Sequence, residues 1–293
     1  MKKSKRKGTM DTNKGDAEMD SRYINPYTDF GFKKIFGEEA SKNLLVDFLN
    51  SILPENYRVE TLELRPTEQL PDSFVDRKAI FDIACRSPSG EQFIVEMQKA
   101  KQQWFKDRAL FCSSFVIQRQ AKKGDWNFKL NPVIFVAILD FEYDERAERR
   151  EIERQVALKD QNGNVFSESL QMVFLQMPLF TKTESELVTH KDKWLYFLKN
   201  LESFEEIPAI LREPIFEQAF EIAEWVKYPP ALQEAYWESR KAYLDNINAL
   251  KTAKEEGRDE REIEIATGMK QEGLGNDMIT RLTGLSTAEI ERL

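Results

Sequence analysis

A run of eight residues, 132–139, constrains the fold of this chain more than any other segment. It reads PVIFVAIL, carries no polar side chain, and stands between Asn131 and Asp140. A continuous apolar run of this length fits a strand that is covered on both faces, and it is too short to cross a bilayer. The sequence therefore predicts an α/β fold in which helices flank a central sheet.

Segments on either side of that run supply the other strands and helices. Alternating apolar residues and turn residues predict strands at 57–65, 78–85, 92–98, 148–158 and 165–175. Helical spacing of apolar residues predicts helices at 28–53 and 101–123, and a helical, increasingly charged pattern from about 183 onward. The strands at 78–85 and 92–98 are separated by turn residues, so we expect them to form a β-hairpin.

Composition excludes several classes of catalytic site. The chain has 293 residues, two cysteines and one histidine. It lacks the ligands for a Cys/His zinc site, and no motif of a Ser-His-Asp or Cys-His mechanism surrounds His190. Any catalysis must therefore use carboxylates, lysines and a metal bound through oxygen.

The N-terminal residues 1–22 are polar, with a cluster of lysines and an arginine at positions 2–7. We expect a disordered basic tail that either touches nucleic acid or is simply a solvated end. No apolar segment follows this basic cluster, and we expect no secretion signal. The sequence predicts a cytoplasmic protein that does not associate with membranes.

The predicted hairpin contains the candidate catalytic residues. Residues two apart in a strand share a face, so Glu96 and Gln98 point to the same side. If Cys85 pairs with Phe93, Asp82 lies opposite Glu96, and the Cβ atoms of the two carboxylates are about 4.5–5.5 Å apart. Such a pair is destabilising unless a cation lies between its members, and a divalent cation with oxygen ligands fits. The alternative is a solvent-facing strand edge without a function.

An ordered series of motifs resembles the PD-(D/E)XK nuclease superfamily, and within it the recombination-promoting nuclease or transposase family. The resemblance covers most of residues 23–293, and its ordered series is more specific than any one motif. The matching segments are NPYTDFGFKKIFG at 25–37, FDI at 81–83, IVEMQ at 94–98, RAL at 108–110, Gln120 with Gly124-Asp125, PVI at 132–134, and the tail segments 255–257 and 283–286.

The resemblance implies a restriction-endonuclease-like core, a central mixed sheet flanked by helices, with a helical C-terminal extension. It also implies a DNA endonuclease that uses Mg²⁺ or Mn²⁺ and is linked to recombination or mobile elements. Asp82 and Glu96 would hold the metal, which stabilises charge on the phosphoryl oxygens and lowers the pKa of an attacking water.

The third catalytic position, Gln98, departs from the lysine of the superfamily, although this family commonly has glutamine there. Glutamine can orient water or phosphate but cannot carry charge or act as a base. Lys99 should face away from the site in a regular strand. Asp29 and Gln120 match further family positions and are additional candidates, although Asp29 could equally be a helix cap.

Residues 97–124 form a basic stretch in a chain whose net charge is -8. Their only acidic residue is Asp107, and phosphate contacts by such a stretch give affinity for DNA without reading its sequence. Trp104 within it and Trp126 just beyond either stack on bases or pack. The expected DNA-binding residues are Lys99, Lys101, Lys106, Arg108, Arg119, Lys122 and Lys123.

Residues 232–293 are expected to form a C-terminal extension to a nuclease-like domain at 23–231. A charged helical linker interrupted at Gly257 precedes short helices with breaks at 273–275 and at Gly284, and Ser286 begins a capping box. This helix-turn-helix-like segment is not basic, so docking or homo-oligomer formation competes with DNA binding. Three hypotheses remain: an active nuclease, an inactive nuclease-derived DNA-binding module, and an assembly protein.

Overall fold

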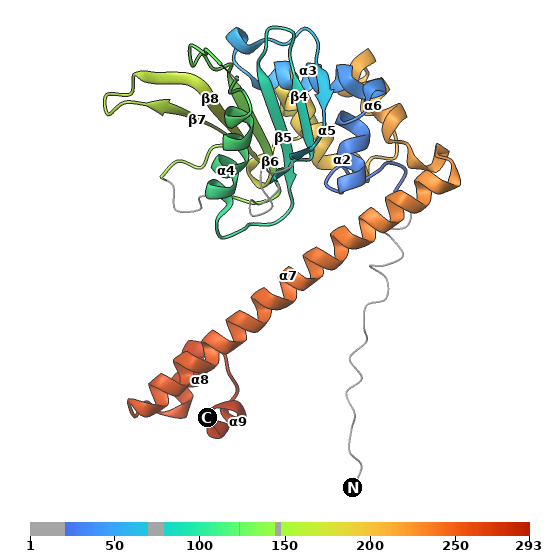
Figure 1. Ribbon diagram of the computed structural model, residues 1–293. Helices are drawn as coiled ribbons and strands as arrows, with labels where there is room; N and C mark the ends of the chain where they lie inside the picture. Colours follow the sequence, from blue (N-terminus) through green and yellow to red (C-terminus); the bar gives the residue numbers. More distant parts are fainter. Residues whose placement is uncertain (1–20, 70–78, 123, 144–147) are drawn as a thin grey trace. The chain divides into compact units, whose positions relative to one another are not determined.

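The structure is a computed structural model that describes residues 21–69, 79–122, 124–143 and 148–293 (Figure 1). The chain divides into two compact units, Met1–Arg240 and Lys241–Leu293, so the division lies nine residues beyond the boundary expected at residue 231. Most of the expected basic tail lies outside the described residues. Its last two residues are bound, because Trp225 Nε1 donates to the Ser21 carbonyl at 2.7 Å and Arg22 pairs with Glu224 at 2.8 Å.

The first unit contains a six-stranded mixed sheet, as the sequence predicts. Strands at its centre run parallel and the outer pairs are antiparallel. The order across the sheet is β1 (Glu63–Arg65), β4 (Ile83–Arg86), β5 (Gln92–Gln98), β6 (Val133–Leu139), β8 (Val165–Gln176) and β7 (Glu153–Lys159). Two short strands, β2 (Glu68–Gln69) and β3 (Ala79–Ile80), pair separately.

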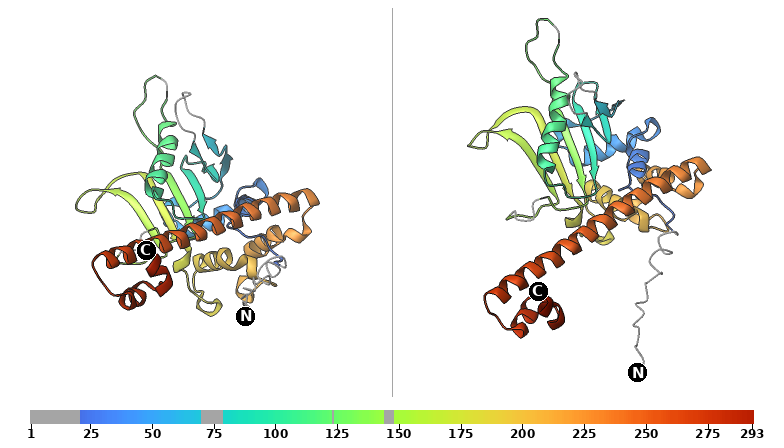
Figure 2. Two further views of the ribbon diagram at one scale, coloured as in Figure 1. Left: turned by 90° about the horizontal axis from the view of Figure 1, so that it is seen from below. Right: turned by 60° about the horizontal axis from the view of Figure 1, so that its bottom comes forward.

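Helices cover both faces of this sheet. Helix α4 (Phe105–Gln118) lies across one face, and the helices α2 (Asp29–Phe36), α3 (Lys42–Ile52), α5 (His190–Asn200) and α6 (Pro214–Ala223) gather on the other side (Figures 1 and 2). All seven residues of β6 are buried, so the prediction of a strand covered on both faces is confirmed. Behind the sheet, Trp194 is fully buried against the rings of Phe36, Phe48 and Phe216.

Some predicted elements are shorter than expected. The segment 57–65 forms a strand only at β1, after a 3₁₀ turn at Glu55–Tyr57, and the helix expected at 101–123 spans only α4. The strand expected at 78–85 is divided between β3 and β4. Phe81 N–H donates to the Thr67 carbonyl, and Met97 N–H donates to the Asp82 carboxylate. Because of these two bonds, Phe81 and Asp82 do not continue the backbone pairing of β4 with β5.

The second unit contains most of helix α7 (Pro230–Gln271) followed by α8 (Asn276–Thr283) and α9 (Thr287–Arg292). The interruption predicted at Gly257 is wrong, because α7 continues through it. One glycine costs a helix only about 1 kcal/mol, and the ion pair Arg258–Glu262 supports the same turns. The break at Gly284, with φ of 78°, and the capping box of Ser286 and Glu289 are confirmed. Within the described ranges, no helix has both the length and the apolar character needed to cross a membrane.

Candidate active site

The strand that carries the predicted site lies inside the sheet. β5 pairs with β4 on one side and with β6 on the other. Glu96 is 2% exposed and Gln98 is 7% exposed, so the alternative of a solvent-facing strand edge is wrong. Both side chains share the face of β5 that carries Ile94, which packs in the core beneath α4.

The register of the hairpin agrees with the sequence prediction. Cys85 pairs with Phe93, and Ile83 pairs with Val95. This register places Asp82, one residue before β4, opposite Glu96. The Asp82 carboxylate is fixed there because its Oδ2 accepts a hydrogen bond of 2.7 Å from Met97 N–H. The charge of Asp82 acts on Glu96, so the two carboxylates lie near one another at the open end of the hairpin.

Burial disfavours ionisation of both carboxylates. Desolvation raises the pKa of Asp82, and the nearby charge of Asp29 raises it further, although the bond from Met97 N–H opposes this shift. Desolvation, followed by the charge of Asp82, raises the pKa of Glu96 to about 7, while Arg108 and Gln98 act in the opposite direction. A group that titrates near neutrality because of burial and a like charge is typical of functional sites.

Glu96 has one oxygen with a partner and one without. Its Oε2 accepts 2.8 Å from Gln98 Nε2 and lies 4.0 Å from Arg108 Nη2. Its Oε1 is buried and has no hydrogen-bond partner among the described residues. An unsatisfied buried carboxylate oxygen costs free energy, so this atom marks a place where a ligand would be stabilising.

These residues fit a divalent cation. The free Oε1 of Glu96 and the adjacent Asp82 carboxylate offer hard oxygen ligands, and a cation would relieve their mutual repulsion. No set of three His, Cys, Asp or Glu side chains among the described residues could hold a metal. Two carboxylates nevertheless suit Mg²⁺, which keeps several waters and commonly takes its remaining ligands from substrate phosphate.

Lys99 follows directly after β5, which ends at Gln98. Burial lowers the pKa of Lys99, while the charges of Asp29 and Asp82 raise it. Lys99 therefore lies within electrostatic reach of Asp82. The expectation that its side chain faces away from the site stays a prediction.

Asp29 belongs to the electrostatic surroundings of the site through its effect on Asp82 and Lys99. It does not cap α2, because the N-cap is Thr28, whose hydroxyl accepts from Gly31 N–H at 2.9 Å. A Cβ at Gly31 would stand 2.1 Å from the Asn25 carbonyl oxygen, so this position requires glycine. The 25–37 motif thus builds the turn that presents Asp29, which also pairs with Lys33 at 2.9 Å.

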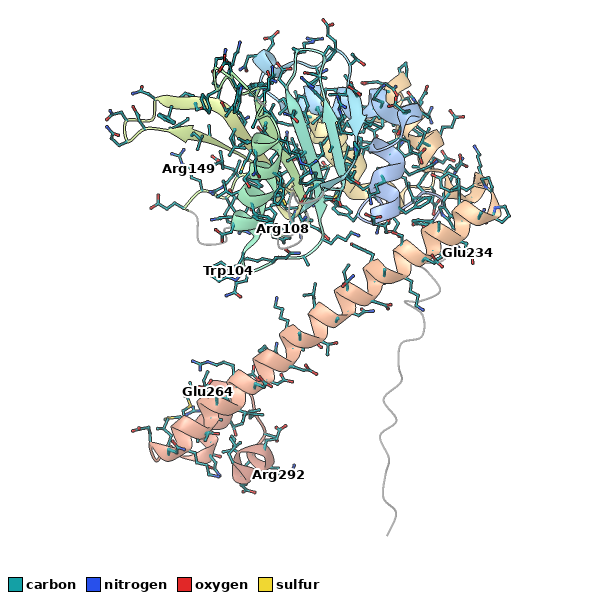
Figure 3. The ribbon with its side chains drawn as sticks, viewed as in Figure 1. Trp104, Arg108, Arg149, Glu234, Glu264 and Arg292 are labelled. Carbon is teal, nitrogen blue, oxygen red and sulfur yellow. The ribbon has the colours of Figure 1, made fainter. Side chains whose placement is uncertain are left out.

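The expected DNA-binding residues occupy different places. Arg108 reaches from α4 toward Glu96, and Figure 3 shows it on the same helix end as Trp104, which is 67% exposed. Lys101 and Lys122 are exposed, and Lys106 is exposed with its Nζ 5.1 Å from the centroid of the Tyr143 ring. Lys123 lies outside the described residues, and Arg119 caps the far end of α4.

Gln120 is not brought to the carboxylates. Its side-chain amide donates to the Asn131 carbonyl at 3.0 Å and accepts from Asn131 N–H at 2.7 Å. Asn131 precedes β6, next to the start of β5, where Gln92 N–H donates to the Pro132 carbonyl. Gln120 therefore closes the α4–β6 loop at the end of the parallel strands opposite to Glu96.

Asp140 is a half-buried carboxylate that the sequence prediction treated only as the end of a strand. Burial raises its pKa to about 6, and Lys199 opposes that shift. β6 presents Val133, Phe135, Ala137 and Leu139 to the α4 face, so alternation places Asp140 on the other face of the sheet. An aspartate directly after a buried strand was the signal in the sequence.

Comparisons with known proteins give one match. A family model described as PD-(D/E)XK nuclease family transposase matches residues 26–253. No curated protein matches the chain, and no solved structure matches it. The matched range includes both carboxylates, Lys99, Arg108 and the whole sheet.

Proposed function

This chain belongs to the PD-(D/E)XK nuclease family transposases, and from that premise we propose that it is a metal-dependent DNA endonuclease that hydrolyses phosphodiester bonds. The family supports a nuclease- or transposase-related function. The observation that carries the finer proposal is the buried Glu96 beside the half-buried Asp82, with one glutamate oxygen unpartnered among the described residues and two cations nearby. We further propose that the reaction serves DNA recombination or mobile elements.

In this proposal Asp82 and Glu96 hold Mg²⁺ or Mn²⁺, both of which favour oxygen ligands. When bound, the metal stabilises charge on the phosphoryl oxygens and lowers the pKa of water. Gln98 holds one oxygen of Glu96 by its 2.8 Å hydrogen bond, which leaves the other oxygen directed to the ligand. Met97 N–H fixes the Asp82 carboxylate in the same way.

Lys99 supplies the positive charge that glutamine cannot. Its position within electrostatic reach of Asp82 suits an ammonium that binds a non-bridging phosphoryl oxygen and stabilises the charge that develops there. Arg108, 4.0 Å from Glu96 on its exposed side, suits a contact with the adjacent phosphate. Lys101, Lys106 and Lys122 then provide phosphate contacts outside the site.

The test is nicking of supercoiled plasmid with Mg²⁺, Mn²⁺ or EDTA. The variants Asp82→Ala and Glu96→Ala should abolish metal-dependent nicking. Asp140→Asn is the matched control, because Asp140 is, like Asp82, a half-buried carboxylate with a raised pKa but lies on the opposite face of the sheet. Nicking that survives in both site variants would exclude this mechanism, and loss in the control as well as in the site variants would indicate a general effect on folding.

Two alternatives have their own supporting observations. Gln98 in place of a lysine favours a nuclease-derived DNA-binding module without turnover, which would bind DNA in a salt-sensitive manner and never nick it. The second unit has eight basic and eleven acidic residues and exposes Leu250, Ile263 and Leu282, which favours self-association over DNA contact. Removal of residues 241–293 should then lower the molar mass measured by light scattering.

A further inference from the structure

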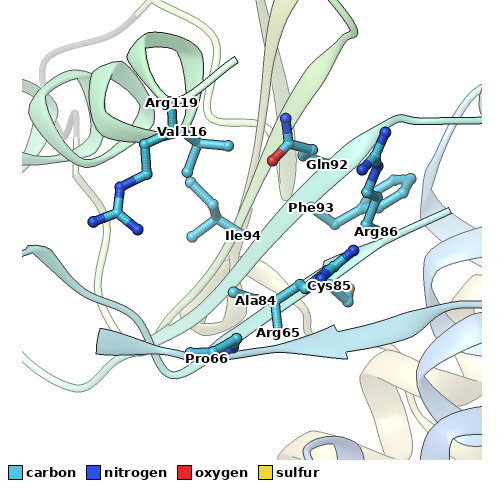
Figure 4. A pocket seen from close by; sticks show the side chains of 10 residues that line it. All are labelled: Arg65, Pro66, Ala84, Cys85, Arg86, Gln92, Phe93, Ile94, Val116 and Arg119. Carbon is cyan, nitrogen blue, oxygen red and sulfur yellow. The ribbon is translucent and has the colours of Figure 1, made fainter. Parts of the chain in front are cut away.

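The turn end of the β4–β5 hairpin borders a second polar feature, a cavity of about 280 Å³. Ala84, Ile94 and Val116 contribute an apolar floor between the strands and α4 (Figure 4). This volume corresponds to about nine water molecules, so it admits a phosphate group with part of its hydration shell.

Three arginines line this cavity, and each comes from a different element. Arg65 ends β1, Arg86 ends β4, and Arg119 caps α4 (Figure 4). We call them the arginine pocket. All three side chains are exposed, so their charges are solvated and a ligand can reach them.

The charged side chains among the described residues that line the arginine pocket are all positive. Among the described residues that line it there is no Asp or Glu. The neighbouring Glu63 pairs with Arg65 at 2.9 Å, but Arg86 forms no ion pair with a described residue. In a chain of net charge -8, three guanidinium groups around one cavity favour an anion. Guanidinium groups bind phosphate oxygens in pairs, which makes phosphate the best-matched anion.

The register of the hairpin relates this pocket to the carboxylates. Arg86 pairs with Gln92, and Ala84 pairs with Ile94. Continuing by two residues leads to Asp82 opposite Glu96, so both features lie on the face of the hairpin that α4 covers. Four residues of strand separate them, which is about 13 Å.

We propose that the arginine pocket binds a backbone phosphate of the DNA strand whose scissile phosphate lies at Asp82 and Glu96. This subsite rests on the proposed function, because that function supplies the DNA strand. It adds Arg65 and Arg86, which lie outside the basic stretch 97–124, to the residues that hold DNA. Two phosphates held at opposite ends of one hairpin limit how the DNA strand can lie on the protein.

The experiment compares Arg65→Gln/Arg86→Gln with wild type in DNA binding by fluorescence anisotropy, in EDTA, over a series of salt concentrations. Each phosphate contact that is lost should make the slope of log K against log salt shallower by about 0.9, so the double variant, which loses the one phosphate of the pocket, should lose about 0.9. The matched control is Arg58→Gln/Arg212→Gln, which removes two exposed arginines that do not line the pocket. Equal melting temperatures would show that all three proteins are folded.

Three outcomes are decisive. A shallower slope in the pocket variant, with the control unchanged, supports the subsite whether or not the wild type nicks plasmid. An unchanged slope in the pocket variant overturns the subsite, and wild-type nicking in the same preparation would leave the nuclease proposal standing. If inorganic phosphate at constant ionic strength stabilises wild type but not the pocket variant, while both bind DNA equally, the site takes free phosphate and the assignment to DNA is wrong.

Discussion

The two ends of the β4–β5 hairpin carry opposite charges in opposite environments. At the open end, Glu96 is buried and Asp82 is half-buried, and the Glu96 pKa rises to about 7. At the turn end, Arg65, Arg86 and Arg119 remain exposed around a cavity. The negative end therefore lowers the stability of the fold at neutral pH, whereas the solvated positive end does not. A carboxylate that destabilises a central strand is typical of a catalytic site. Solvated arginines around a cavity are instead typical of a binding site.

The largest expected effect separates catalysis from binding. Glu96→Gln keeps the shape of the side chain but removes the negative charge that holds a cation. Metal-dependent nicking at saturating DNA should fall by about 10³-fold or more, because a bound metal contributes several kcal/mol to the transition state. Affinity for DNA in EDTA should stay within about twofold of wild type, or increase, because a buried negative charge is removed. Gel-based nicking rates and anisotropy measure the two quantities.

The opposite pattern would contradict this contrast between the ends of the hairpin. Arg65→Gln/Arg86→Gln should weaken binding while nicking at saturating DNA stays near the wild-type rate. If the arginine variant lost turnover and Glu96→Gln lost affinity, the turn end would act in catalysis and the open end in DNA binding.

The next effect concerns stability as a function of pH. The folded-state pKa of Glu96 is raised from 4.5 to about 7, so its protonated form is the one compatible with the fold. Its favourable contribution is complete below the unfolded pKa and is lost as pH rises through about 7. In EDTA, Glu96→Gln should match wild type near pH 4.5 and exceed its free energy of unfolding by about 3 kcal/mol near pH 8.

Urea unfolding at several pH values measures this difference. Glu55→Gln is the control, because Glu55 is exposed and its replacement should leave the pH profile of wild type unchanged. If the free energies of unfolding of Glu96→Gln and wild type differed by the same amount at every pH, the pKa of Glu96 would be the same in the folded and unfolded states.

Local features of the sequence were sufficient for much of this hairpin. The turn residues between the two strands and their alternation fix the pairing of Cys85 with Phe93, because the register of a hairpin depends on a short loop and on which face is apolar. The apolar run at β6 likewise has one plausible environment, a strand buried on both faces. The family match at residues 26–253 agrees with the motifs in that range.

Other parts of the candidate site depend on contacts between distant elements. That Arg108 reaches Glu96 depends on how α4 packs on the sheet, which spacing along the chain does not determine. The charge of Asp29, which lies on α2 far from β5 in the sequence, acts on Lys99 and Asp82 only because the fold brings these elements together. Arg65 and Arg86 become neighbours through the pairing of β1 with β4, and neither belongs to a basic stretch of sequence.

A smaller effect is expected for the cation at the negative end. Lys99→Met removes an ammonium within electrostatic reach of Asp82, and nicking should fall by about 10- to 100-fold, or about 1.4–2.7 kcal/mol. Lys99→Arg should recover part of the rate because it keeps the charge. Lys101→Met is the matched control, since Lys101 is an exposed lysine two residues further along. Equal loss in the Lys99 and Lys101 variants would indicate general phosphate attraction instead of a role at the site.

The smallest effect separates charge from geometry at the positive end. Arg86→Lys preserves the number of cations at the arginine pocket, so the salt slope of DNA binding should remain that of wild type. Lysine cannot form the paired hydrogen bonds of a guanidinium, so affinity at a fixed salt concentration should fall by about three- to tenfold. Anisotropy titrations at constant salt and across a salt series measure both quantities. If Arg86→Lys bound DNA as tightly as wild type, the pocket would act only through its net charge, and the phosphate would be attracted there without being held in one orientation.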